Sequence, residues 1–135
     1  MRNILSSRNS TLRFAAALAV LLLAPGSPAQ ERTETYEVVR GNWTISARNI
    51  EDEEWVTKYV EISQNGTHIW GRFQGPNQEG GIEGFVEGKH IEFSTKTREV
   101  LTFRGQVDGD TMSGNYGIKG RHAPFKAVRT STKPS

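Results

Sequence analysis

The amino-acid sequence predicts an all-β protein in which eight strands form an antiparallel up-and-down (meander) barrel. The first observation is a motif that occurs four times, a glycine with an apolar residue two positions before it and another two positions after it, in the segments 69–73, 82–86, 103–107 and 112–116. Apolar residues two apart lie on one face of a strand, and a glycine between them lets that strand coil sharply. The second observation is that short alternating runs are separated by turn residues, with no sustained helical periodicity. These features favour a sheet that curls into a closed barrel, and an open two-sheet sandwich is the alternative.

Residues 1–29 are typical of a cleaved secretory signal peptide. Three arginines precede an apolar run at 14–24 that is too short to span a bilayer, and small residues follow up to Ala29. No cysteine follows the apolar run, so attachment through a lipidated cysteine is excluded, and an uncleaved N-terminal anchor is the alternative. We therefore expect a periplasmic or secreted protein with no stable membrane anchor.

The charge balance argues against a nucleic-acid partner. The chain has 17 basic and 15 acidic residues, but three of the basic residues lie in 1–29. The remainder therefore holds 14 basic and 15 acidic residues, a formal net charge of −1. A domain without a net positive charge lacks the electrostatic signature of nucleic-acid binding. With no cysteine in the chain, disulfides and thiolate metal sites are also excluded.

The rest of the chain is predicted to be one domain with short flanking segments. Residues 30–40 are mostly polar and are expected to form a flexible lead-in, the barrel domain is expected at 41–130, and 131–135 are expected to be a disordered tail. Alternation and turn residues predict eight strands. They are expected at 41–48, 55–64, 67–73, 82–87, 90–96, 100–108, 111–118 and 124–130.

Three two-residue turns set the predicted register of the sheet. Asn65-Gly66 suits a type I′ turn, whereas Gly88-Lys89 and Gly109-Asp110 suit type II′ turns. In each hairpin the apolar set then faces the apolar set, which supports the meander. The predicted opposing pairs are Ile62 with Ile69, Val60 with Gly71, Val86 with Ile91, Gly84 with Phe93, Val107 with Met112, Gly105 with Gly114, and Phe103 with Tyr116.

The same alternation assigns one set of side chains to the interior of the barrel. Small and large residues alternate in that set, as the tapering interior of an eight-stranded barrel requires. The set is Trp43, Ile45, Val60, Ile62, Ile69, Phe73, Val86, Ile91, Phe93, Leu101, Phe103, Val107, Met112, Tyr116, Ile118 and Phe125.

A tryptophan near the start of the first strand and an arginine near the end of the last strand form a recognisable combination. Gly41-Asn42-Trp43 opens the first strand, and the segment 125–129 closes the last strand with Arg129. This combination resembles the calycin superfamily, the lipocalins and avidin-like proteins, in which a Gly-x-Trp tryptophan packs beneath a basic residue of the final strand. The resemblance implies that Trp43 and Arg129 form the pair that closes one end of the barrel. It implies no particular ligand, because the chain lacks the biotin-holding polar set of avidin-like proteins and the later loop motif and C-terminal helix of lipocalins.

The connections predicted at 49–54, 74–81, 97–99 and 119–124 share the end of the barrel opposite Trp43. Because loops are longer at this end, we expect it to be the mouth of the barrel. The aromatic interior residues favour a mostly filled barrel with a shallow pocket at the mouth. The candidate ligand-binding residues are Lys58, Phe73, Ile82, Thr95, Leu101, Ile118, Arg121 and Phe125.

Lys58 is the unusual member of this set. It falls on the same face of its strand as Val56 and Val60, so its ammonium group is predicted to lie inside the mouth, where it could hold a carboxylate or phosphate. The alternative is that a bulge turns Lys58 outward, or that its stem carries the charge to the rim. Arg121 is expected on the same rim, facing the acidic loop 51–54.

The outer face of the barrel is predicted to carry exposed aromatic side chains on neighbouring strands. Tyr59, Trp70 and Phe85 point outward in the alternation, as does Trp55, and Trp70 is expected directly opposite Phe85. Exposed aromatic residues anchor many protein interfaces, so this face is a candidate surface for a homo-oligomer or for an envelope protein. The alternative is that the lead-in 30–40 folds over it.

No catalytic residue, metal site or cofactor is predicted. None of His68, His90 and His122 has a nucleophile or carboxylate at a useful spacing, and motifs for nucleophilic, phosphate or metal chemistry are absent from the sequence. The first hypothesis is therefore an exported non-catalytic module that binds a small apolar or amphipathic molecule at the barrel mouth. The alternative is a protein-interaction or inhibitor module of the cell envelope. A third hypothesis, an enzyme of the barrel-cyclase or isomerase type, requires an ionisable group inside the lumen.

Overall fold

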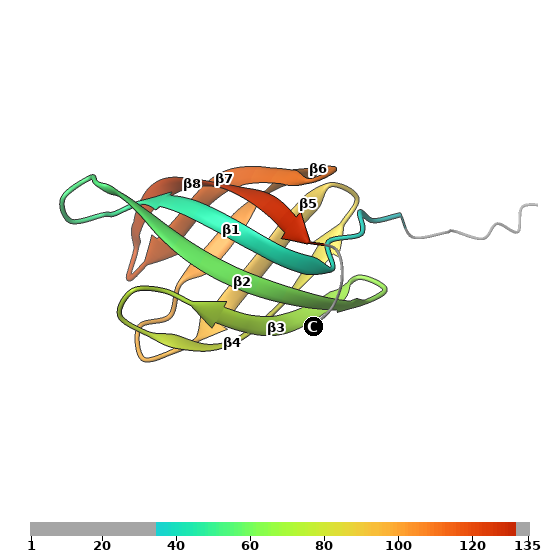
Figure 1. Ribbon diagram of the computed structural model, residues 1–135, viewed down its shortest axis with the longest axis horizontal. Helices are drawn as coiled ribbons and strands as arrows, with labels where there is room; N and C mark the ends of the chain where they lie inside the picture. The colour runs from blue at the N-terminus through green and yellow to red at the C-terminus, as the bar shows by residue number, and fades with distance from the viewer. Residues whose placement is uncertain (1–34, 132–135) are drawn as a thin grey trace, which may run out of the picture. The chain divides into compact units, whose positions relative to one another are not determined.

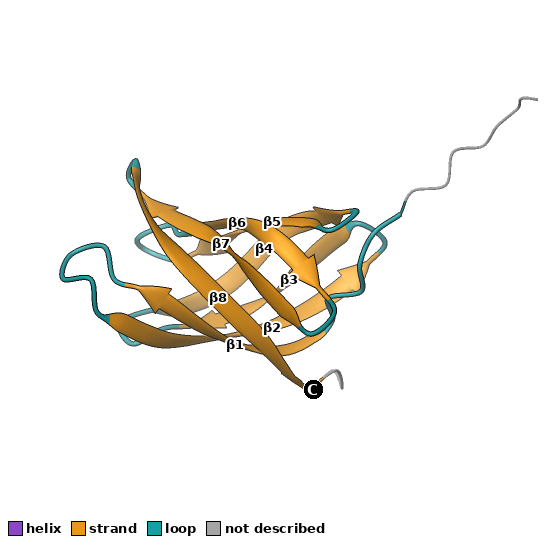
Figure 2. Cartoon of the chain, turned by 90° about the horizontal axis from the view of Figure 1, so that it is seen from above, coloured by secondary structure: helices purple, strands orange, loops and turns teal. Residues whose placement is uncertain are grey.

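The computed structural model describes residues 35–131 and shows a closed eight-stranded antiparallel barrel (Figures 1 and 2). Each strand pairs with its neighbours in the chain, and β1 pairs with β8. No helix occurs in this part of the chain, and therefore none that is long and apolar enough to cross a membrane. The predicted signal peptide, residues 30–34 and residues 132–135 lie outside the described residues. The strands are β1 (Gly41–Arg48), β2 (Trp55–Asn65), β3 (His68–Gln74), β4 (Glu79–Glu87), β5 (His90–Lys96), β6 (Thr102–Asp108), β7 (Thr111–Ile118) and β8 (Arg121–Ser131).

The predicted meander barrel is confirmed, and the sandwich alternative is wrong. The decisive contact is between the first and last strands, because a sandwich would leave two open edges there. β1 pairs with β8 from Ala47, opposite Phe125, to Trp43, opposite Arg129, with a bulge between Asn42 and Trp43. The sheet therefore has no open edge along most of its length, which a barrel achieves by closure.

Two of the three predicted hairpin registers are confirmed. Val86 pairs with Ile91 and Val107 pairs with Met112, as the turns at Gly88 and Gly109 require. The register of the β2–β3 hairpin is wrong by two residues, because its two-residue turn is Gly66-Thr67 and Ile62 pairs with Gly71. Gly66, Gly88 and Gly109 each open their turn with a positive φ of 57–66°, a conformation that glycine adopts without strain.

The connection between β7 and β8 is a tight turn and not the long loop predicted at 119–124. Lys119 and Gly120 both have positive φ, 50° and 83°, and Ile118 pairs with Arg121. Pro124, where the predicted loop 119–124 and the predicted strand 124–130 meet, lies within β8 opposite Asn115. A proline is tolerated there because β1 pairs with β8 only from Phe125 onward, so this part of β8 is an edge.

The strand glycines allow neighbouring backbones to approach closely. Gly105 faces Gly114 across β6 and β7, and a Cβ atom on either one would collide with a backbone carbonyl oxygen of the opposite strand. The same collision would occur at Gly71 and Gly84. The glycines of the four repeated motifs therefore mark positions at which neighbouring strands approach closely.

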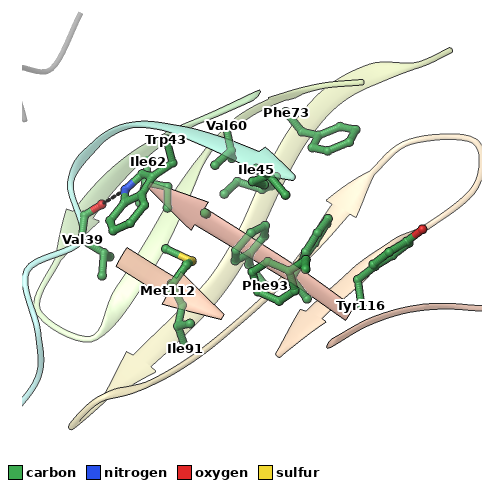
Figure 3. Close-up of a cluster of buried hydrophobic side chains, with 14 of the residues drawn as sticks. Val39, Trp43, Ile45, Val60, Ile62, Phe73, Ile91, Phe93, Met112 and Tyr116 are labelled. Atoms are coloured by element: carbon green, nitrogen blue, oxygen red, sulfur yellow. Dashed lines mark hydrogen bonds between the residues drawn. The ribbon is translucent and has the colours of Figure 1, made fainter. Parts of the chain in front are cut away.

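Aromatic side chains fill the middle of the barrel, and Figure 3 shows part of this core. Phe103 lies at its centre: its ring stacks on Phe93 at 4.9 Å and on Tyr116 at 5.4 Å, and meets Phe125 edge-on at 5.1 Å. All predicted interior residues are buried except Ile118, which is partly buried. The core also includes residues that the prediction did not assign to the interior, namely Val39, Ala47, Ala123 and Ala127.

One end of the barrel is closed by Trp43, Arg129 and the segment that precedes β1. The Arg129 guanidinium lies 4.7 Å from the centre of the Trp43 ring, so the predicted pair forms. The indole Nε1 donates a hydrogen bond of 2.9 Å to the carbonyl oxygen of Val39 (Figure 3). Val39 is fully buried, and Tyr36 forms a parallel bridge with Gly88. Tyr36 and Val39 of the segment that precedes β1 therefore contact the closed end of the barrel.

Candidate ligand-binding site at the barrel mouth

The opposite end of the barrel holds a cavity of about 560 Å³. Its apolar lining consists of Val56, Phe73, Leu101 and Ile118, together with the ring of Tyr116. Its rim comes from the connections between β1 and β2, β3 and β4, β5 and β6, and β7 and β8. The aromatic core ends the cavity below, so the barrel is mostly filled and the pocket lies at the mouth, as the sequence predicted.

Lys58 lies on the wall of this cavity. β1 and β2 pair without a bulge through Lys58, which lies opposite Ile45, so alternation directs the side chain inward with Val56 and Val60. The alternative in which a bulge turns Lys58 outward is therefore wrong. Among residues 35–131, Lys58 has no ion-pair partner, and its ammonium forms no hydrogen bond with another side chain. Burial lowers the pKa of the Lys58 ammonium from its ordinary value, because the apolar wall solvates the charged form poorly.

Two of the three other cations at the mouth are paired with carboxylates. Arg121 donates hydrogen bonds to Oε2 of Glu51 at 3.0 Å and to the carbonyl oxygen of Ile50 at 3.3 Å, which fixes the β1–β2 connection. Lys119 lies 3.8 Å from Glu99. The lining residues include four cations (Lys58, Arg98, Lys119 and Arg121) and two anions (Glu51 and Glu99), so the cavity has an excess of positive charge.

Five of the eight predicted ligand-binding residues line the cavity. They are Lys58, Phe73, Leu101, Ile118 and Arg121. The other three do not line it: Ile82, Thr95 and Phe125 are each only 2% exposed and belong to the packed wall. The Thr95 hydroxyl oxygen accepts a hydrogen bond from the backbone amide of Leu101 at 3.0 Å, so it holds the β5–β6 connection in place.

Several lining residues were not predicted. Tyr116 was predicted to be an interior residue but not a site residue. A buried phenol hydroxyl needs a hydrogen-bond partner, and this requirement indicates a position near the polar rim. The Tyr116 hydroxyl donates to the carbonyl oxygen of Arg48 at 2.7 Å, and burial raises the pKa of the phenol. Gln78 and Arg98 lie in connections, where alternation does not tell which way a side chain points.

On the outer face, the predicted partner surface separates into two groups. Trp55 and Tyr59 on β2 are 52% and 53% exposed, and Trp70 on β3 and Phe85 on β4 are 41% and 36% exposed. Tyr59 pairs with Gln74, four residues from Trp70 and hence roughly 13 Å away along β3. All four rings remain exposed although residues 35–40 are in place, so the described part of the lead-in does not cover them.

Trp70 does not lie opposite Phe85, because the β3–β4 register differs from the expected one by two residues. Trp70 pairs with Glu83, and His68 pairs with Phe85. The His68 ring stacks on the Trp70 ring at 5.1 Å, and the Phe85 ring lies 6.0 Å from the ring of His90. We define Trp70, His68 and Phe85 as the β3–β4 aromatic group.

Two histidines have carboxylate partners, contrary to the sequence analysis. His68 Nε2 lies 3.1 Å from Glu83, and His90 Nε2 lies 3.7 Å from Glu92. Lys96 and then His68 lower the pKa of the Glu83 carboxyl group by hydrogen bonding to the carboxylate. These pairs lie on the outer face, and the described residues contain no group of three side chains that could hold a metal ion. Neither pair lines the cavity that contains Lys58. The enzyme hypothesis requires an ionisable group inside the lumen, and Lys58 is such a group.

Comparisons with protein-family models, curated proteins and solved structures find no match for this chain. The closed eight-stranded meander is consistent with the calycin-like resemblance of the sequence. Function must therefore be argued from the geometry of the site itself.

Proposed function

We propose that the protein binds a small amphipathic anion in the mouth of the barrel. The observation that carries the proposal is a lysine without a partner among the described residues, on the wall of a cavity whose lining combines apolar side chains with an excess of cations. A buried charge is costly unless it is paired, and a side chain that bears this cost without a partner in the described protein is suited to pair with a ligand.

The remaining lining residues fit the same ligand. Phe73 and Leu101 offer an apolar lining for a hydrocarbon portion, and the excess of cations favours a carboxylate or phosphate head group. Small-molecule sites commonly combine an apolar lining with a few convergent polar groups. A calycin-like carrier or sensor that is exported by its signal-like N-terminal segment would be consistent with these features.

The test is a calorimetric titration with three probes of equal chain length: dodecanoate, dodecanol and dodecyltrimethylammonium. We expect dodecanoate to bind roughly ten- to a hundredfold more tightly than dodecanol, the ratio that a charge-assisted hydrogen bond supplies. Lys58→Gln should remove this preference, whereas Lys89→Gln, at the closed end, should keep it. The preference should also disappear as pH rises through the lowered pKa of Lys58, because the ammonium then loses its proton. Equal affinities for dodecanoate and dodecanol, or an unchanged preference in Lys58→Gln, would contradict the proposal.

The β3–β4 aromatic group favours a second candidate function, a protein-interaction module of the envelope. Trp70 is exposed and stacked on His68, and the exposed Phe85 lies opposite that histidine in the sheet, so exposed rings gather on neighbouring strands. Sedimentation of the purified protein should then reveal self-association, which Trp70→Ala abolishes while Trp55→Ala, in the other aromatic group, does not. A monomer at all accessible concentrations that also captures no envelope protein would rule this candidate out.

A further inference from the structure

The wall of the cavity includes a short strand edge that has no neighbour. β2 begins at Trp55, and its first four residues pair with β1, from Arg48 opposite Trp55 to Ile45 opposite Lys58. On its other side β2 pairs with β3 only from Tyr59, which lies opposite the last residue of β3, Gln74. β2 therefore extends beyond the end of β3 toward the mouth (Figure 1). We refer to residues 55–58 as the free edge of β2.

This free edge leaves backbone groups without partners. In an antiparallel pair, alternate residues direct both their N–H and their C=O toward the same neighbour. Two of the four residues therefore direct these groups toward β1, and the other two direct them to the side where β3 has ended. Between residues 35 and 131 the backbone hydrogen bonds outside the strand ladders include none from this edge. Unpaired strand edges are the surfaces on which an extended backbone adds.

The free edge borders the same cavity as Lys58. Val56 and Lys58 of the free edge line this cavity, and so do residues 75–78 of the β3–β4 connection. Three chemical features are thus brought together: an apolar lining, amide and carbonyl groups that lack a strand partner, and a cation. A simple fatty acid would use the first and the third, but not the second.

We infer that the ligand is an N-acyl amino acid, in which an amide lies between a hydrocarbon chain and a carboxylate. This inference rests on the proposed function and specifies its ligand class. The hydrocarbon chain packs on Phe73 and Leu101, the amide N–H donates a hydrogen bond to a backbone carbonyl oxygen of the free edge of β2, and the carboxylate meets the Lys58 ammonium.

The first experiment compares N-dodecanoylglycine with its ester analogue, O-dodecanoylglycolate. The two probes share the chain and the carboxylate, but only the first has an N–H donor. We expect the amide to bind roughly two- to tenfold more tightly, the ratio that one net hydrogen bond supplies. N-dodecanoylglycinamide, which lacks the carboxylate, should lose the dependence on Lys58 that Lys58→Gln reveals for the other two.

The second experiment measures amide hydrogen exchange residue by residue with N-dodecanoylglycine present and absent. In the free protein two alternate amides of the 55–58 edge should exchange fast, and at least one of them should gain protection when the probe lies along the edge. The amides of Val60 and Ile62, which lie between two paired strands, serve as controls and should be protected throughout.

Equal affinities for the amide and the ester, with no gain of protection at 55–58, would overturn this inference. If dodecanoate still shows its Lys58-dependent preference in that case, the proposed function stands and only the ligand class is wrong. If no probe shows a preference that depends on Lys58, both are overturned.

Discussion

At the closed end of the barrel the Arg129 guanidinium makes four hydrogen bonds, whereas at the mouth the Lys58 ammonium makes none with the described residues. Arg129 donates to a carboxylate oxygen of Asp110 and to the carbonyl oxygens of Val38, Arg40 and Gly109. Its side chain is only 8% exposed, and it stacks on Trp43. The same barrel thus holds one cation whose three nitrogens all donate hydrogen bonds and one cation that has no partner among the described residues.

The difference shows how a small barrel can divide stability and binding between its two ends. A buried cation with a complete set of acceptors contributes to a unique packing arrangement, whereas a desolvated cation without acceptors lowers stability and gains a partner only from outside. We therefore expect substitutions at the closed end to act mainly on folding and substitutions at the mouth mainly on binding.

The largest effect should follow the removal of the closed-end tryptophan. Trp43→Ala leaves a cavity beneath Arg129 and removes the indole donor to Val39, and we expect the free energy of unfolding to fall by about 3–5 kcal/mol. Chemical denaturation monitored by far-UV circular dichroism measures this change. A loss below about 1 kcal/mol would show that the closed end does not stabilise the barrel as described.

A pair of arginine substitutions at opposite ends tests the comparison directly. Arg129→Ala leaves three backbone carbonyl oxygens without their donor and should cost about 2–4 kcal/mol. Arg121→Ala removes an exposed ion pair with Glu51 and should cost no more than about 1 kcal/mol. The measurement is again the free energy of unfolding of each variant relative to the parent protein. Equal losses would contradict the division between the two ends.

The smallest effect, and one of opposite sign, is expected at Lys58. Lys58→Met should slightly raise the free energy of unfolding at neutral pH, because it removes a charge that burial disfavours. The folded protein binds the lysine proton less tightly than the unfolded chain does, so stability of the parent rises as pH passes from the lowered pKa toward the ordinary value. The advantage of Lys58→Met should therefore shrink over the same alkaline range.

Urea denaturation at neutral and alkaline pH measures this effect, with Lys89→Met at the closed end as the control. A destabilised Lys58→Met protein at neutral pH would mean that the lysine contributes to folding, in conflict with its unpartnered state.

Most of the architecture was predictable because it depends on local patterns. Apolar residues at spacing two identify the interior face, and glycines such as Gly88 and Gly109 locate turns whose length sets the register. The pairing of Trp43 with Arg129 followed from a family resemblance and not from the alternation itself.

The errors in register have a common physical origin. A shift of two residues between neighbouring strands keeps every side chain on its face, so the apolar pattern of β3 is satisfied equally by both registers. The observed register agrees with contacts that are distant in the sequence: the side chain of Gln64 donates to the carbonyl oxygen of Glu37 and accepts from the amide of Val39. No pattern within β2 or β3 reports such contacts.

The site was predicted in part for the same reason. Lys58 lies within a strand, where alternation gives its direction, and it was placed correctly. Ile82 and Thr95 also point inward, but the depth at which the aromatic core ends depends on how Phe73 and Phe103 pack, which the sequence does not state. The free edge of β2 was not predicted, because it arises from a difference in where two strands end.

The closed end is also where the described chain starts and finishes. The carbonyl oxygen of Thr35 accepts a hydrogen bond from Gly88, and Ser131 pairs with Asn42 at the beginning of β1. Both points lie on the side of the barrel opposite the cavity (Figure 1). An affinity tag or a surface linkage attached beyond either point would therefore hold the protein by its closed end. The mouth would stay accessible to solution, which makes immobilised formats suitable for measuring ligand binding.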